Sequence, residues 1–128
     1  MSDLPIQPPT ELKLRKKSRE LEVRFADGMQ GRLSAEYLRV YSPSAEVKGH
    51  VAGEGILVTG KESVNIARIE PVGLYAVRLA FDDGHDTGLY TWAYLYELCS
   101  EQERKWQRYL ERLEQAGKVR RPEPKWAQ

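Results

Sequence analysis

The segment Ile69–Leu98, IEPVGLYAVRLAFDDGHDTGLYTWAYLYEL, decides the fold of this chain. It opens with a Pro71–Gly73 corner, and the two-residue spacing that follows predicts a strand with one buried face. The apolar positions of that strand are Tyr75, Val77, Leu79 and Phe81. Asp82–Gly84 then supplies the short acidic residues and the glycine that a tight turn requires. Thr91 is placed to cap a short helix that carries Trp92, Leu95 and Tyr96.

An earlier part of the chain repeats this pattern. Val23–Leu38 and Leu79–Leu95 both run through a strand, an Asp-Gly pair, polar residues, a hydroxyl cap, an aromatic residue and a leucine. Two copies of one unit, each unable to bury its apolar face alone, predict packing about an approximate two-fold axis. We therefore predict a strand-rich α+β single domain of two hairpin-plus-short-helix units, followed by a C-terminal amphipathic helix.

The N-terminal and central elements are shorter. Residues 1–9 contain three prolines and predict a disordered lead-in, with the folded domain spanning 10–117. Alternating leucines before and after the basic stretch Lys16–Arg19 predict two strands joined by a turn. Ile56–Val58 and Val64–Ile66 predict two further short strands around another turn.

The C-terminal part reads as one helix and a tail. Ser100 and Glu103 have the spacing of a capping box, and Gly117 follows as a stop, so we predict a helix over about 100–116. Its apolar stripe is formed by Trp106, Tyr109, Leu110 and Leu113. Residues 118–128 predict a flexible tail, in which Trp126 is either an anchor on the domain or a disordered residue.

Composition excludes several classes of protein. The 128 residues fit one domain, and 20 basic against 19 acidic side chains give a net charge of +1, unlike a nucleic-acid binder. The basic run Lys13–Arg19 is better explained as the solvated face of a strand. No apolar run approaches the roughly 20 residues that cross a bilayer. The single cysteine, Cys99, fits a reducing compartment, so we expect a cytoplasmic protein with a buried, unreactive thiol.

Histidine and carboxylate residues offer weak candidates for chemistry. His85 lies among Asp82, Asp83 and Asp86, and His50 is the only other imidazole. An acid directly after a histidine diverges from it in an extended chain, so these residues do not spell out a metal site. Gly55–Lys61 resembles a phosphate-binding loop, but glutamate stands where a hydroxyl should hold magnesium. We find no nucleophile motif and expect no enzyme activity.

Several segments together resemble a known family. They are Leu33–Arg39, Tyr41–Val47, Ile69–Gly73 and Phe81–Trp92. They are similar to small stand-alone bacterial proteins of the gamma-butyrobetaine hydroxylase-like N-terminal domain family, over about residues 10–98. The resemblance implies a compact, strand-rich domain that also occurs in front of iron- and 2-oxoglutarate-dependent oxygenases and attached to P-loop iron–sulfur carriers. About 30 residues after Leu98 are too few for such an oxygenase domain.

The resemblance also implies a zinc site that this sequence does not keep. In the hydroxylases three cysteines and one histidine hold zinc, and the matching positions here are Ser42, Ser44, Val47 and His85. A hydroxyl is a poor zinc ligand and valine is none, so we expect that site to be absent.

Two hypotheses for function follow. The first is a non-catalytic accessory module without a cofactor, binding a protein of iron-dependent or iron–sulfur machinery, such as an iron–sulfur carrier or an oxygenase. Its expected surface consists of Asp82, Asp83, His85, Asp86, Tyr90 and Trp92, with His50 as an added candidate. The alternative is a weak iron-binding protein or oxidoreductase-associated subunit that uses His50 and His85. A nucleic-acid binder using Lys13–Arg19 ranks third, and the oligomeric state stays open.

Overall fold

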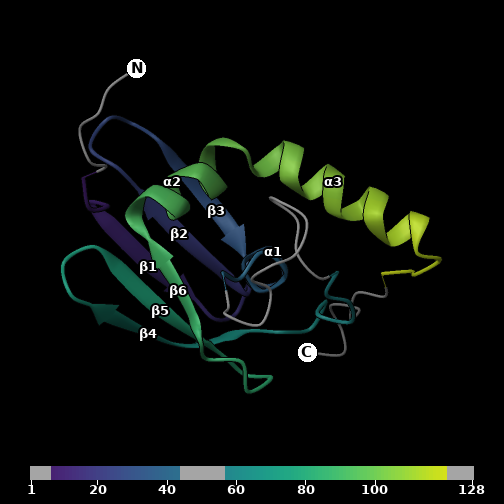
Figure 1. The fold of residues 1–128 in the computed structure, drawn as a ribbon. Coiled ribbons are helices and arrows are strands. Elements are labelled where there is room, and N and C mark those ends of the chain that lie inside the picture. The colour runs from purple at the N-terminus through teal and green to yellow at the C-terminus, as the bar shows by residue number, and fades with distance from the viewer. Residues whose placement is uncertain (1–6, 44–56, 121–128) are drawn as a thin grey trace.

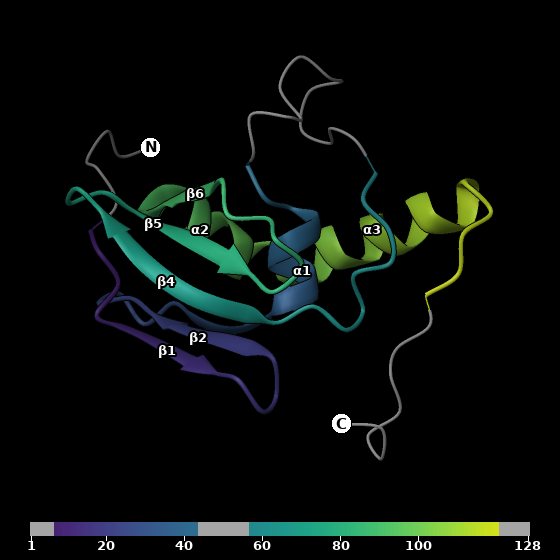
Figure 2. The same cartoon turned by 90° about the horizontal axis from the view of Figure 1, so that it is seen from below.

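The computed structural model describes residues 7–43 and 57–120, which form two antiparallel sheets and three helices (Figure 1). In chain order the elements are β1 (Glu11–Arg15), β2 (Glu20–Arg24), β3 (Gln30–Ser34), α1 (Ala35–Val40), β4 (Ile66–Val72), β5 (Ala76–Phe81), β6 (Gly88–Thr91), α2 (Trp92–Ser100) and α3 (Gln102–Gln115). The strand orders are β1-β2-β3 and β4-β5-β6. Figure 2 separates the two sheets, with β4 and β5 above β1 and β2. The predicted α+β class is confirmed.

The strand alternation in the sequence sets the buried face of the first sheet. Leu21 and Val23 lie opposite Leu14 and Leu12 in the β1–β2 register, and both β2 residues are fully buried. Glu22 lies between them and faces the other side of the sheet, because successive side chains alternate. Both sheets, α1 and α2 contribute to one core.

The internal repeat is confirmed by hydrogen bonds at matching positions in the two units. In the turns, Asp27 Oδ1 accepts from the Met29 N–H at 2.9 Å and Asp83 Oδ1 accepts from the His85 N–H at 3.1 Å. Both turns therefore close in the same way, with an aspartate bonded to the backbone two residues on.

The two helix starts match as well. Ser34 Oγ accepts from the Tyr37 N–H at 3.0 Å, and Thr91 Oγ1 accepts from the Tyr94 N–H at 3.1 Å. Each hydroxyl satisfies a backbone donor that has no partner within its helix, which is why Ser and Thr are favoured here. The Thr91 cap was predicted from the sequence and is confirmed.

A reciprocal pair of tyrosine hydrogen bonds joins the units to each other. Tyr37 Oη donates to the Leu98 carbonyl at 2.8 Å, and Tyr94 Oη donates to the Tyr41 carbonyl at 2.5 Å. Each tyrosine of one helix thus satisfies a carbonyl at the end of the other unit's helical segment. The approximate two-fold arrangement follows from this exchange.

Some predicted strand positions are wrong. Tyr75 lies in the turn between β4 and β5 and is 54% exposed, whereas Val77, Leu79 and Phe81 are buried in β5 as predicted. Leu57 and Val58 form no strand; Ile56 lies outside the described residues. The Val58 carbonyl instead accepts from Tyr109 Oη at 3.0 Å, so this segment contacts α3 and does not join a sheet.

The predicted capping box of the last helix is wrong, while its glycine stop is confirmed. Ser100 is the final residue of α2 and Glu101 precedes α3 without a side-chain cap. At the other end Gly117 has φ of 71°, the Gly117 N–H donates to the Glu114 carbonyl at 3.0 Å and the Lys118 N–H donates to the Leu113 carbonyl at 2.8 Å. These bonds form a Schellman motif, which explains the glycine stop.

Within residues 7–43 and 57–120, no helix has the length and apolar composition needed to cross a bilayer. Trp126 and most of the predicted tail and lead-in lie outside these residues.

Candidate functional site

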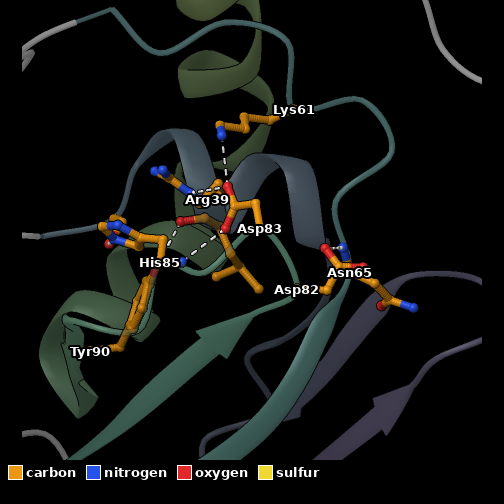
Figure 3. Close-up of polar contacts among 9 residues, drawn as sticks. Arg39, Lys61, Asn65, Asp82, Asp83, His85 and Tyr90 are labelled. Atoms are coloured by element: carbon orange, nitrogen blue, oxygen red, sulfur yellow. Dashed lines mark hydrogen bonds and ion pairs between the residues drawn. The ribbon is translucent and has the colours of Figure 1, made fainter.

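The candidate site surrounds the turn Asp82–Asp86, which joins β5 to β6 (Figure 3). The Phe81 N–H donates to the His85 carbonyl at 2.9 Å, and Gly84 adopts φ of 91°, a conformation that glycine reaches without strain. Asp82 exchanges two hydrogen bonds with Asn65 just before β4: its N–H donates to the Asn65 carbonyl at 2.9 Å, and its Oδ1 accepts from the Asn65 N–H at 3.0 Å. The turn is therefore fixed from both sides before any ligand binds.

Asp83 is the charged centre of this site. Its Oδ2 accepts from Arg39 Nε of α1 at 2.9 Å and lies 2.7 Å from Lys61 Nζ of the loop before β4. Burial alone would raise the pKa of the Asp83 carboxyl, but Lys61, the His85 N–H and Arg39 outweigh it and hold that pKa at about 2. Asp83 is therefore an anion at neutral pH, and it joins three segments that are far apart in the sequence.

His85 contacts the interior through Ser42. Ser42 Oγ lies 2.9 Å from His85 Nε2, and Ser42, just after the C-cap of α1, is only 7% exposed. Ser42 Oγ also lies near the Tyr90 hydroxyl, which donates to the Leu38 carbonyl at 2.5 Å. Ser42 thus places the imidazole of His85 beside a tyrosine that is fully buried.

The first unit of the fold contains the same turn and its aspartate, but without the two cations and the histidine. Asp27 Oδ2 accepts from the neutral Tyr96 hydroxyl at 2.6 Å. Tyr96 is the counterpart of Arg39, because each lies at the same distance along the chain from the N-cap of its helix. Methionine stands where the second turn has His85. The aspartate contact is therefore required by both turns, whereas the positive charges and the imidazole are present at one turn only.

A second matched pair shows the same difference. A Cβ added to Gly31 would lie 3.3 Å from Cys99 Sγ, and one added to Gly88 would lie 2.4 Å from Ser42 Oγ. Gly88 therefore cannot carry a Cβ unless Ser42 shifts, whereas Gly31 is only tightly packed against Cys99 of the other unit's helix. Cys99 is buried, and burial raises the pKa of its thiol to about 11, whereas Ser42 at the equivalent position contacts His85. The expectation of a buried thiol is confirmed.

The structure divides the surface predicted from the sequence. Asp82, Asp83, His85 and Asp86 lie together in the turn, but Tyr90 is fully buried, so its place in that surface was wrong. Trp92 lies at the opposite end of β6, where its indole Nε1 donates to the Leu74 carbonyl at 2.9 Å. The short β6 strand separates the two groups.

Arg39 and Lys61 were missed in the sequence analysis. Lys61 gives no local indication of its role, because it approaches Asp83 only through the loop before β4. Arg39 could have been found by comparing the two units position by position, since its counterpart is the uncharged Tyr96.

Only some of the candidate metal-binding residues lie in the part of the chain that the structure describes. His50, Ser44 and Val47 lie outside the described residues, and within the described ranges no three His, Cys, Asp or Glu side chains are grouped so as to hold a metal ion. The contact between Ser42 and His85 does bring together two positions that the family resemblance assigns to zinc ligands. A hydroxyl at one of them forms a hydrogen bond with the imidazole, and hydroxyls are not among the usual zinc ligands.

Comparison with known proteins now identifies the family. The family profile described as "Gamma-butyrobetaine hydroxylase-like, N-terminal" matches residues 12–96. This chain belongs to that family. A search of curated proteins gave no match.

Solved structures of similar proteins support the same fold for this family member. Two NMR solution structures are 57% and 46% identical in sequence, with TM-scores of 0.78 and 0.79. The first match covers 95% of this chain and 89% of the other, and the second covers 93% and 94%. A crystal structure of an Acidithiobacillus ferrooxidans protein of unknown function, from the DUF971 family, is 45% identical with a TM-score of 0.61. That match covers 73% of this chain and 93% of the other.

Proposed function

We propose that this chain is a non-catalytic binding module that recognises a partner protein through an acidic-turn surface. We define this surface as the turn Asp82–Asp86 together with Arg39 and Lys61. The observation that carries the proposal is the difference between the two units: the fold needs the aspartate of each turn, but only the second turn has two cations and a histidine.

Charge and order at this surface favour recognition. Asp83 already holds Arg39 and Lys61 in place, and their side chains are 14% and 24% exposed. Charged groups fixed before association lose little conformational freedom on binding, and they select a partner of complementary charge. Asp82 and Asp86 are exposed beside them, so the surface presents both signs of charge within one turn.

The contacts of His85 favour an accessory role over catalysis. Its Nε2 is hydrogen-bonded with Ser42, whose side chain is buried next to the buried Tyr90. This hydrogen bond fixes the orientation of the imidazole. We propose that the ring is a shaped contact for the partner, without a cofactor of the module's own.

The partner that we propose is a protein of iron-dependent or iron–sulfur machinery. Support comes from the family, whose description places this domain at the N-terminus of hydroxylase-like proteins. A P-loop iron–sulfur carrier and an iron- and 2-oxoglutarate-dependent oxygenase from the same organism are the two candidates to test.

The test is an NMR titration of the ¹⁵N-labelled chain with each purified candidate. We expect amide shifts concentrated at Asp82–Asp86, Arg39 and Lys61, and weakening of the interaction by salt because exposed charges are screened. His85→Met should reduce the affinity about tenfold or more, which corresponds to roughly 1.4 kcal/mol. This variant should fold, because the other turn carries methionine at the same position.

Met29→Leu is the matched control, since it changes the equivalent turn without touching the acidic-turn surface. Its affinity should equal that of the wild type. Absence of shifts at Asp82–Asp86 with both candidates, or equal losses in the two variants, would argue against the proposal. Stoichiometric iron in the purified protein that is lost on His85→Ala would favour the metal-binding alternative with His50.

A further inference from the structure

A buried carboxylate in α1 is neutralised by an arginine that comes from beyond the last helix. Glu36 is 6% exposed, and its two oxygens accept from Arg120 Nε at 2.8 Å and Arg120 Nη2 at 2.6 Å. This is the bidentate fork geometry in which a guanidinium matches a carboxylate. The other unit has the exposed Ala93 at the equivalent helix position, so the fold itself does not require an acid here.

Aromatic and acidic groups complete a pocket around the guanidinium. The Arg120 Cζ atom lies 5.2 Å from the centre of the Trp106 ring, within the range of a cation–π contact. Glu62 also lies close enough to Arg120 to favour its charged form. We call this the Glu36 pocket, and its carboxylates and indole face are the groups that recognise an arginine side chain.

The backbone that delivers Arg120 is held loosely in comparison. Lys118 and Val119 are exposed, with Val119 at 71%, and they directly follow the Schellman motif that ends α3. A segment with few buried contacts can open at a small cost in free energy, whereas the emptied pocket would leave a buried charge unpaired. Exchange for another guanidinium keeps that charge paired.

We propose that the Glu36 pocket is a binding site for an arginine side chain of a partner polypeptide, and that Arg120 is its internal occupant in the free protein. The partner's guanidinium forms the two hydrogen bonds to Glu36 and stacks on Trp106 while the C-terminal segment moves away. The pocket shares no residue with the acidic-turn surface, so the two sites can be tested separately.

The experiment uses the full ¹⁵N-labelled chain and two probes, Nα-acetyl-arginine amide and Nα-acetyl-lysine amide. In Arg120→Ala the arginine probe should produce saturable shifts of the Trp106 indole N–H and the Glu36 amide. The wild type should bind the arginine probe at least about tenfold more weakly than Arg120→Ala does. The reason is that apparent affinity falls with the fraction of molecules in which the pocket is open. The lysine probe should bind Arg120→Ala more weakly than the arginine probe, because an ammonium cannot form the fork.

The double variant E36Q/R120A is the control, because it retains the shape of the pocket without the carboxylate charge that pairs with the guanidinium. This variant should fold, but the arginine probe should no longer produce saturable shifts in it. No saturable shift in Arg120→Ala, or an equal affinity in the double variant, overturns the proposal. If Arg120→Ala does not fold alone, recovery of its fold by the arginine probe and not by the lysine probe supports the proposal, and absence of recovery overturns it.

Discussion

Replacing Asp83 by asparagine tests the electrostatic core of the acidic-turn surface. Asparagine retains the oxygen that accepts from the His85 N–H, but it removes the charge that pairs with Arg39 and Lys61. The folded-state pKa of about 2, against 3.8 for a free aspartate, corresponds to at most about 2.5 kcal/mol. The Asp83 side chain is 20% exposed and its cations reach solvent, so screening reduces this to about 1 kcal/mol.

Urea unfolding measures this loss. With a slope of about 2 kcal/mol per molar for a domain of this size, Asp83→Asn should lower the urea midpoint by about 0.5 M at pH 7. The pKa is depressed in the folded state, so the stabilisation is complete above the unfolded value of 3.8 and is lost as pH falls toward 2. The difference between wild type and variant should therefore shrink to about half at pH 3.

Asp27→Asn is the matched control, since Asp27 faces the neutral Tyr96 hydroxyl in the equivalent turn. It should lose less stability than Asp83→Asn at pH 7. The reasoning would be refuted if both variants lost the same stability, or if the loss in Asp83→Asn were as large at pH 3 as at pH 7.

Three further predictions concern the interior. Gly88→Ala should cost about 1–3 kcal/mol in thermal unfolding, because its Cβ would lie 2.4 Å from Ser42 Oγ; the added Ser42→Ala should recover part of that loss, and no recovery would contradict the clash. Tyr90→Phe should cost about 1–2 kcal/mol in urea unfolding, because the buried Leu38 carbonyl loses its donor; an unchanged midpoint would contradict this. Cys99 should react with a thiol reagent at pH 8 only slowly until urea unfolds the chain, because burial raises its pKa to about 11; rapid labelling of the native protein would show that the thiol is accessible.

The sequence by itself determined the local features of this fold. The Asp-Gly turns, the Thr91 hydroxyl cap, the Gly117 stop and the repeat of one unit were all predictable. Each depends on hydrogen bonds or backbone angles within a few residues, and such preferences are properties of the residue types themselves. The family followed from the same local segments, and residues 12–96 confirm it.

Only the tertiary structure decided which side chains meet. Tyr90 was assigned to the turn surface from the sequence, but it is fully buried and its hydroxyl donates to the Leu38 carbonyl of α1. Arg39 and Lys61 reach Asp83 only because the two units pack against each other and the loop before β4 returns beside the turn. The Glu36 carboxylate likewise meets Arg120 across most of the chain length. Contacts of this kind depend on the arrangement of whole elements, which residue spacing along one chain does not encode.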